Sequence, residues 1–203
     1  MKLYYSPGTC ALSPHIVLRE AGLPFELVRV DLRTKQLKDG GASFLDINPK
    51  GFVPVLELDD GERFTEGPAI VQYLADQKPE SGLIPRPGTM ERYRALEWLN
   101  YISTEVHKGH SPLFNPKAPE EWKAVVKEQL TRQFGYLTER LAGKEHAMGE
   151  RFTVVDAYLY TVLRWPKLVG IDLAAWPALV AYSQRIEARP AVIEALKAER
   201  LIK

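Results

Sequence analysis

The stretch Lys78–Gly88, KPESGLIPRPG, divides the sequence into two parts of different character. It contains three prolines and two glycines, which interrupt helices and strands alike. Before it, short β-prone runs alternate with short helical ones, whereas after it the apolar residues follow helical spacing over long windows. The pattern predicts two domains, residues 1–78 and 89–203, joined by a linker at residues 79–88.

The first part begins with a predicted β-α-β unit. Leu3–Tyr5 is β-prone, Pro14–Ala21 is helical and is closed by Gly22, and Phe25–Asp31 is β-prone again. Parallel strands require such a crossover. Further on, the sequence predicts two strands at Val55–Leu58 and Arg63–Thr65, a tight turn between them at Asp60-Gly61, and a helix over Pro68–Gln77.

The second part is predicted to be entirely helical. FTVVDAYLY carries Thr153 and Asp156 in the S/T-x-x-D/E spacing of a helix capping box. Two apolar stripes predict the long helices: Met90, Tyr93, Leu96 and Leu99 in one, and Trp122, Val126, Leu130, Phe134, Leu137 and Leu141, ended by Gly143, in the other.

Composition excludes several classes of protein. Lysine and arginine total 27 against 26 acidic residues, a formal net charge of +1, so no overall field favours nucleic acid or an acidic membrane. The first residues, MKLYYSPGTC, lack the apolar run of a signal peptide, and no apolar stretch approaches the roughly 18 residues of a membrane span. The single cysteine favours a reducing compartment. We expect a cytoplasmic protein with neither nucleic-acid nor membrane partners.

Cys10 is the first candidate for chemistry, because SPGTCALSPH places it between a strand and a helix. The uncovered amides and the positive dipole end of a helix start favour a thiolate. The alternative is that Cys10 packs as a small buried hydrophobic residue. Its position at the junction favours the reactive thiol.

Two further segments could bind a peptide-like ligand. Val53 precedes Pro54, and a cis bond there would turn the Val53 backbone outward, although an ordinary loop proline is the commoner case. Glu66 and Gly67 stand at a helix start with Pro68 in the first turn. The amides at the helix start could bind a carboxylate, and Glu66 could accept from an ammonium group. Together they would suit a zwitterionic amino-acid end. Alternatively, Glu66 merely complements the helix dipole.

A polar cluster, NYISTEVHKGHSP, lies near the end of a predicted long helix. Asn100, Thr104, His107 and Lys108 are three or four residues apart, which predicts a shared helix face with cationic character. A solvated helix end is the alternative. His107 and His110 have no third ligand nearby in sequence, so we expect no metal.

The whole chain resembles a bacterial beta-class glutathione transferase. The resemblance is carried by MKLYYSPGTCALSPHI, NPKGFVPVLELDDG, TEGPAIVQYLAD, EWLNYISTEVHKGHSPLF and FTVVDAYLYTVLRW, in that order. It implies an α/β thioredoxin-like N-terminal domain that binds glutathione and an all-α C-terminal domain that carries the electrophile site. It also implies glutathione as cosubstrate and a homodimer.

The resemblance also implies roles for individual residues. Cys10 would lie beside the glutathione sulfur and form a mixed disulfide with it, and His107 and Lys108 would be the other catalytic residues. This chain departs from many relatives by having Ala11 and Gly67 where serines are common, and Tyr5 is expected to be structural. The implied glutathione contacts are Cys10, Lys35 at the carboxylate end, Val53 through its backbone, Glu66 and Gly67 at the γ-glutamyl group, and Asn100, Thr104 and His107 from the helical domain.

The implied activity is transfer of glutathione to small hydrophobic electrophiles, with thiol transfer, peroxide reduction or dehalogenation as accessory reactions. Two other functions stay open. A chain of this kind could bind ligands without catalysis, or it could be a glutaredoxin-type reductase, for which the lone Cys10 permits only a monothiol route.

Overall fold

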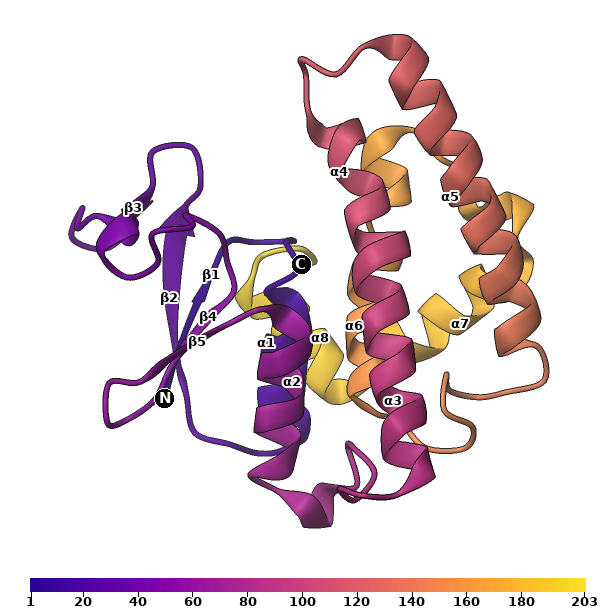
Figure 1. The fold of residues 1–203 in the computed structure, drawn as a ribbon. Coiled ribbons are helices and arrows are strands. Elements are labelled where there is room, and N and C mark those ends of the chain that lie inside the picture. The colour runs from indigo at the N-terminus through magenta and orange to yellow at the C-terminus, as the bar shows by residue number, and fades with distance from the viewer. The chain divides into compact units, whose positions relative to one another are not determined.

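The computed structural model describes residues 1–203 and divides into two compact units (Figure 1). The first unit contains residues 1–83 and 189–203, and the second contains residues 84–188. None of the helices is long and apolar enough to cross a membrane.

A five-stranded mixed sheet forms the centre of the first unit. Its strand order is β3-β2-β1-β4-β5, with β1 and β2 parallel and the other neighbours antiparallel. The register places Leu3 opposite both Leu27 and Leu56. The four predicted strands are therefore present, and only the two-residue β3 was not predicted. The strands are β1 (Lys2–Tyr5), β2 (Glu26–Asp31), β3 (Gln36–Leu37), β4 (Val55–Glu57) and β5 (Arg63–Thr65).

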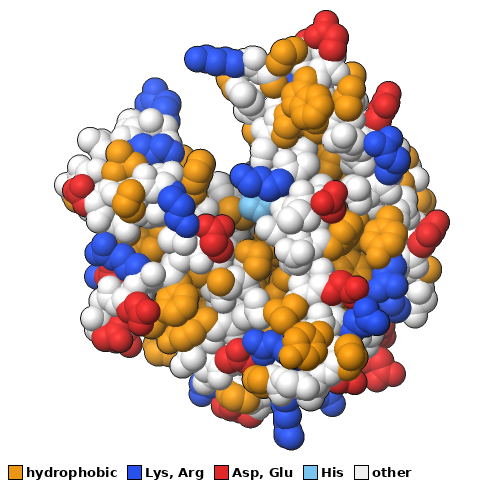
Figure 2. Space-filling view, in the orientation of Figure 1, with side chains coloured by type: hydrophobic (Ala, Val, Ile, Leu, Met, Phe, Trp, Pro, Cys, Tyr) orange, Lys and Arg blue, Asp and Glu red, His pale blue; other side chains and the backbone are white.

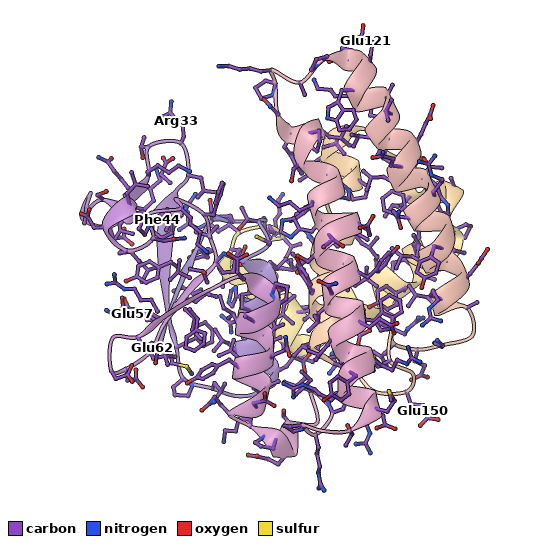
Figure 3. All side chains as sticks on the ribbon, viewed as in Figure 1. Arg33, Phe44, Glu57, Glu62, Glu121 and Glu150 are labelled. Carbon is purple, nitrogen blue, oxygen red and sulfur yellow. The ribbon has the colours of Figure 1, made fainter.

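Three helices complete the first unit: α1 (Leu12–Glu20), α2 (Gly67–Asp76) and α8 (Pro190–Ala198). Helix α1 packs against both α2 and α8. Phe44 of the short 3-10 helix Phe44–Asp46 is fully buried and faces Tyr4, with ring centroids 6.1 Å apart (Figure 3). The predicted helices at Pro14–Ala21 and Pro68–Gln77 correspond to α1 and α2.

Helix α8 differs from the predicted domain boundaries, which placed it with the second part of the chain. It packs on α1 in the first unit. Just before α8, Arg189 donates Nε and Nη2 to the two carboxylate oxygens of Glu20, at 2.7 and 2.9 Å. Helical periodicity identifies a helix but does not say which neighbour covers its apolar face, so the sequence could not assign α8.

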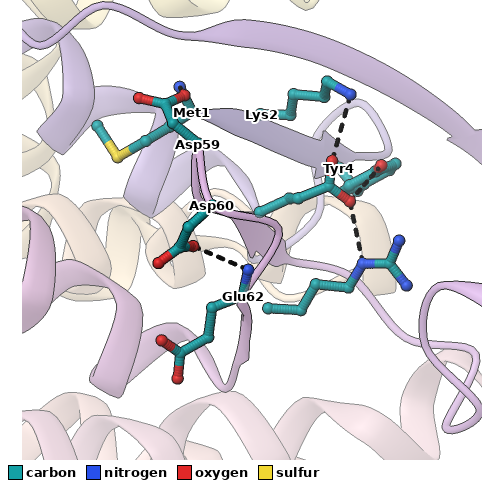
Figure 4. Close-up of polar contacts among 8 residues, drawn as sticks. Met1, Lys2, Tyr4, Asp59, Asp60 and Glu62 are labelled. Carbon is teal, nitrogen blue, oxygen red and sulfur yellow. Dashed lines mark hydrogen bonds and ion pairs between the residues drawn. The ribbon is translucent and has the colours of Figure 1, made fainter.

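Polar contacts join the strands near the amino end of β1 (Figure 4). The Glu57 carboxylate accepts from Lys2 Nζ at 3.2 Å, Tyr4 Oη at 3.1 Å and Arg63 Nε at 3.0 Å. Burial alone would raise the pKa of Glu57, but these donors hold it below its usual value. The predicted turn at Asp60-Gly61 is confirmed, since Asp60 accepts from the Glu62 amide at 3.0 Å.

The second unit is helical, as expected, and its only β pairing is an isolated bridge between His146 and Gly149. Helix α5 (Glu120–Leu141) begins at an exposed position beside Glu121, which is labelled in Figure 3, and ends at the buried Leu141. Hydrophobic side chains lie among charged ones on the molecular surface (Figure 2). The main helices are α3 (Met90–Tyr101), a π-helix at Ile102–His107, α4 (Lys108–Phe114), α5 (Glu120–Leu141), α6 (Val154–Leu163) and α7 (Pro177–Glu187). Short 3-10 helices lie at Pro79–Ser81 in the first unit and at Pro166–Val169 and Leu173–Ala175 in the second.

The two predicted apolar stripes have different outcomes. Five of the six residues of the α5 stripe are buried, and only Trp122 is exposed. In α3, however, Met90 and Tyr93 are exposed, and the buried residues are Ala95, Trp98 and Leu99. A spacing of three residues falls short of the helical repeat of 3.6, so a run of such steps drifts around the helix. The α3 stripe was therefore wrong as a single buried face.

The capping box of α6 is confirmed. Asp156 is fully buried, and its carboxylate accepts from the amides of Ala147 at 2.7 Å and Thr153 at 2.8 Å, and from Tyr182 Oη at 2.8 Å. The Thr153 hydroxyl adds a fourth contact at 3.1 Å. Burial raises the pKa of Asp156, and the hydrogen bonds oppose that rise. One carboxylate thus joins the start of α6 to α7 and to the loop before it.

We expect Asp156→Ala to lower the free energy of unfolding by about 3 to 5 kcal/mol, because several buried donors lose their acceptor at once. Asp172→Ala is the matched control, since Asp172 caps an exposed 3-10 helix with one bond to the Ala174 amide. That change should cost about 1 kcal/mol. Urea denaturation measures both, and equal losses would contradict the assigned role of Asp156.

Candidate functional site

Cys10 lies in the loop between β1 and α1, directly before Ala11, the residue that precedes the first turn of α1. Its side chain is partly buried, and its Sγ donates to the Val53 carbonyl oxygen at 3.3 Å. The Cys10 carbonyl accepts from the amide and the hydroxyl of Ser13, at 3.2 and 3.0 Å. The structure therefore brings together two of the predicted site residues, Cys10 and Val53.

Val53 belongs to the loop Asn48–Pro54, which leads into β4. The Val53-Pro54 bond is cis. Three consecutive carbonyls of the loop each accept from a different side chain: Gly51 from Lys35 Nζ at 2.8 Å, Phe52 from Asn48 Nδ2 at 2.7 Å, and Val53 from Cys10. The Val53 N–H, by contrast, donates to no acceptor in the chain.

Lys35 reaches this loop from the turn after β2. Its backbone has a positive φ of 57°, and its ammonium lies 5.7 Å from the centroid of the Phe52 ring. Phe52 itself is 68% exposed. Arg33, two residues earlier, points outward at the top of the first unit (Figure 3). Lys35 is thus held at the Asn48–Pro54 loop with a charged end beside an exposed aromatic ring.

Glu66 precedes α2 with an unusual backbone conformation, φ 69° and ψ 110°. A non-glycine residue in such a region carries strain of order 1–3 kcal/mol, which clusters at functional sites. The Glu66 carboxylate pairs with Lys50 Nζ at 2.7 Å, and the two side chains are 72% and 52% exposed. Gly67 begins α2, and its N–H also has no acceptor in the chain.

Four of the predicted residues of the first unit therefore meet one loop. Two carbonyls of this loop accept hydrogen bonds, one from Lys35 and the other, that of Val53, from Cys10. Glu66 forms an ion pair with Lys50, which belongs to the same loop. The resulting surface presents an ammonium, a carboxylate, a thiol and two unused amides. Such a set can bind both ends and the backbone of a short peptide.

The predicted residues of the second unit lie at the junction of α3, the π-helix and α4. Asn100 and Thr104 are exposed, and the Thr104 hydroxyl donates to the Asn100 carbonyl at 3.2 Å. His107 instead packs inward, with Nδ1 2.6 Å from Tyr158 Oη and its ring 4.8 Å from that of Trp165.

Thr104 and Lys108 line a cavity of about 400 Å³ against α5. Trp122, Val126 and Leu130 supply its apolar wall. His107, in contact with α6 and the segment after it, is not among the lining residues. The helical spacing predicted a shared face for His107, Thr104 and Lys108; in the structure Thr104 and Lys108 line the cavity, whereas His107 contacts Tyr158 and Trp165. A π-helix bonds residues five apart, so spacings that align side chains on an α-helix do not align them here.

His110 is fully buried, and its Nδ1 bonds the Val106 carbonyl at 2.7 Å while Nε2 has no partner. Burial lowers the pKa of His110. No group of three His, Cys, Asp or Glu side chains in the chain is arranged to hold a metal ion.

Sequence reasoning missed Lys50, Phe52, Tyr158 and Trp165. For the first two a signal existed, because Asn-Pro at Asn48 initiates turns and places the next residues on a loop. For Tyr158 and Trp165, in α6 and just after it, the sequence offers no local signal, and only the three-dimensional structure shows them against His107.

Comparison with known proteins agrees over both units. Residues 8–77 match the family model "Glutathione S-transferase, N-terminal domain", and residues 101–190 match "Glutathione S-transferase, C-terminal domain". Together these matches cover most of the chain. The chain belongs to the glutathione S-transferase family.

Individual members of the family are similar over the full length. Glutathione S-transferase GstA of Escherichia coli O157:H7 is 50% identical, covering 99% of this chain and 100% of that protein. A sphingomonad glutathione S-transferase solved in complex with glutathione is 50% identical with a TM-score of 0.95, covering both chains completely. The beta-class enzyme of Sphingomonas chungbukensis is 49% identical with a TM-score of 0.96, again over both full chains.

These similarities confirm the resemblance to bacterial beta-class glutathione transferases and the expected fold class. The first unit is the thioredoxin-like part and the second is the helical part. The glutathione S-transferase fold here includes α8 in the first unit, where it covers α1.

His110 should make stability depend on pH. The unfolded histidine takes up a proton near pH 6.5, whereas the folded one does so only at lower pH. Between these values the unfolded state binds more protons, so the free energy of unfolding falls as the pH falls, by up to about 1.4 kcal/mol per pH unit from this group.

His110→Gln keeps a donor for the Val106 carbonyl but does not titrate. We expect the stability lost between pH 7.5 and pH 5.5, measured by urea denaturation, to be about 1 kcal/mol smaller in this variant. Above pH 7.5 the two proteins should differ by a constant amount. An unchanged loss in the variant would show that His110 does not carry the effect.

Proposed function

We propose that this glutathione S-transferase binds glutathione on the first unit and uses it as nucleophile or reductant toward small hydrophobic electrophiles. The observation that carries the proposal is the contact between Cys10 Sγ and the Val53 carbonyl at 3.3 Å, on a loop that also receives Lys35. The complex of the sphingomonad relative with glutathione supports the choice of ligand.

The unused amides suggest how the tripeptide would bind. The Val53 N–H can pair with the peptide backbone, as a strand edge does. The Gly67 N–H, at the start of α2, can donate to the α-carboxylate of the γ-glutamyl group. Glu66 would then accept from the ligand's ammonium, sharing or replacing Lys50, and Lys35 would face the carboxylate at the other end of the tripeptide.

Two reactions follow for sulfur at this site. In conjugation, the glutathione thiolate attacks an electrophilic carbon, and a C–S bond forms as the leaving group departs with its electron pair. In thiol exchange, the Cys10 thiolate attacks one sulfur of oxidised glutathione, whose S–S bond breaks. A Cys10–glutathione disulfide forms, and one glutathione thiolate leaves. As Cys10 is the lone cysteine, the second reaction must follow a monothiol route.

Residues of the second unit are proposed as contributors on the strength of the family resemblance. His107 and Lys108 would favour the thiolate by their positive character, with Asn100 and Thr104 adding polar contacts to glutathione. The apolar wall beside Thr104 and Lys108 offers hydrophobic surface within the region proposed to receive electrophiles. The single cysteine, which cannot close an intramolecular disulfide, and a net charge of +1 suit a cytoplasmic enzyme without nucleic-acid partners.

Replacing Cys10 should separate the two reactions. In Cys10→Ala and Cys10→Ser, thiol exchange should be abolished, because no other side chain can replace sulfur in that step. Some conjugation should survive, since its nucleophile is the ligand's own sulfur. Both activities are assayed in parallel, and mass spectrometry tests the oxidised native protein for a glutathione adduct on Cys10. Full exchange activity in either variant, or absence of the adduct, would contradict the proposed role.

Glu66→Ala should weaken glutathione binding at least tenfold, because a charge-assisted hydrogen bond worth about 1.5 to 3 kcal/mol is lost. Glu62→Ala, in the neighbouring hairpin (Figure 4), removes the same charge away from the loop and should bind normally. Isothermal titration calorimetry with glutathione measures both. Equal affinity in the native protein and Glu66→Ala would exclude Glu66 from the site.

We also propose a homodimer, as the family resemblance implies and as is commonest among soluble oligomers. Sedimentation velocity at micromolar concentration should show a species of twice the 23.0 kDa chain mass. A monomer alone under these conditions would rule the dimer out.

A further inference from the structure

A chain of hydrogen bonds runs through the buried interior of the first unit, between α1, the end of α8 and the loop that carries Cys10. Arg19 Nε donates to His15 Nε2 at 2.9 Å, and His15 Nδ1 lies 2.9 Å from Glu199 Oε1. The other oxygen of Glu199, Oε2, accepts from the Gly8 amide at 2.9 Å. The His15 and Glu199 side chains are both completely buried.

The hydrogen-bond geometry determines which atoms of Arg19, His15 and Glu199 carry protons. Arginine can only donate, so His15 Nε2 must accept and carries no proton. The proton of the neutral ring is therefore on Nδ1, which donates to Glu199. Both oxygens of Glu199 face donors, so its carboxylate is ionised. A buried negative charge of this kind is costly unless donors surround it, and here the donors are His15 and Gly8.

The Gly8 amide connects the Glu199 carboxylate to the loop that carries the Cys10 thiol. The φ of Gly8, 71°, is left-handed, and a Cβ on this residue would lie 3.4 Å from the Leu201 side chain. Past Gly8 the chain turns, with the Thr9 hydroxyl donating to the Ser6 carbonyl at 2.7 Å. Cys10 follows, and its Sγ reaches Val53. The loop is thus held at Gly8 by Glu199 and at Cys10 by the Asn48–Pro54 loop.

We propose that Glu199, whose carboxylate accepts from His15 and from the Gly8 amide, is a positioning residue that fixes the Gly8 amide and thereby the loop presenting the Cys10 thiol. The inference rests on the proposed function of Cys10. It assigns a part in the thiol chemistry to a residue at the opposite end of the chain, one that touches neither the thiol nor the proposed ligand contacts.

Glu199→Gln tests the proposal with almost no change in shape. If the new NH2 group faces His15, it meets the Nδ1–H, and two donors face each other. His15 could move its proton to Nε2, but that proton would then face the Nε–H of Arg19. If the amide group faces Gly8 instead, it meets the Gly8 N–H. No arrangement satisfies every group, so the link to the loop must weaken. Glu194→Gln is the matched control, because Glu194 bonds the outer side of Arg19 and is 64% exposed.

Three measurements on the folded proteins decide the question. Hydrogen exchange reports the Gly8 amide, which should exchange at least tenfold faster in Glu199→Gln. The rate at which oxidised glutathione modifies Cys10 should fall at least tenfold, because attack on a disulfide requires alignment. The rate of alkylation by iodoacetamide, a small reagent that needs no glutathione site, should rise at least threefold as the thiol loosens from Val53. Glu194→Gln should remain within twofold of the native protein in all three.

Faster Gly8 exchange with both Cys10 rates within twofold of native would overturn the proposal and leave Glu199 a purely structural residue. Circular dichroism confirms folding at the assay temperature. If Glu199→Gln does not fold, Arg19→Met removes the donor that fixes His15 and should move all three readouts in the same directions; unchanged readouts there also overturn the proposal. Failure of the proposed function is distinct, because the native protein itself would then form no glutathione adduct while the iodoacetamide rates still test the positioning.

Discussion

The buried side chain of Asn48 shapes the loop on which the candidate site depends. Its Nδ2 donates to the Phe52 carbonyl at 2.7 Å, and its Oδ1 accepts from the Lys50 amide at 3.2 Å. Its backbone carbonyl accepts from Gly51. The loop bends around the side-chain amide of Asn48. Its Gly51 and Val53 carbonyls therefore accept from Lys35 and Cys10, and its Lys50 pairs with Glu66. Residues from four separate segments are therefore placed by a single turn.

Each unit contains one deeply buried carboxylate that joins distant segments. Asp156 in the second unit is surrounded by two amides and two hydroxyls, and it ties α6 to Tyr182 of α7. Glu199 in the first unit has one amide and one imidazole, and it ties α1 to the loop after β1. In both, the free-energy cost of burying a carboxylate is offset in the same way, because its oxygens contact only hydrogen-bond donors. Asp156 has a local capping signal and Glu199 has none.

That difference explains how much the sequence could predict. Four of the five strands, the approximate positions of α1 and α2, the Asp60-Gly61 turn and the capping box depend on neighbours within a few residues, and these features were predicted correctly. The placement of α8, the inward packing of His107 and the pairing of Lys50 with Glu66 depend on contacts between residues far apart in sequence, which no local pattern encodes. The resemblance to beta-class transferases selected Lys35, Val53 and Glu66 together, and the structure gathers them at one loop.

The packing of α8 on α1 also has a consequence for the order in which the protein can fold during synthesis. Residues 1–83 leave the ribosome first, but the apolar face of α1 that α8 covers stays open until residues 189–203 have been made. The helical unit, continuous in sequence, has all its parts earlier. Domains commonly fold from the N-terminus as they emerge, but here the middle of the chain can be complete while the first-made part still waits for its last helix.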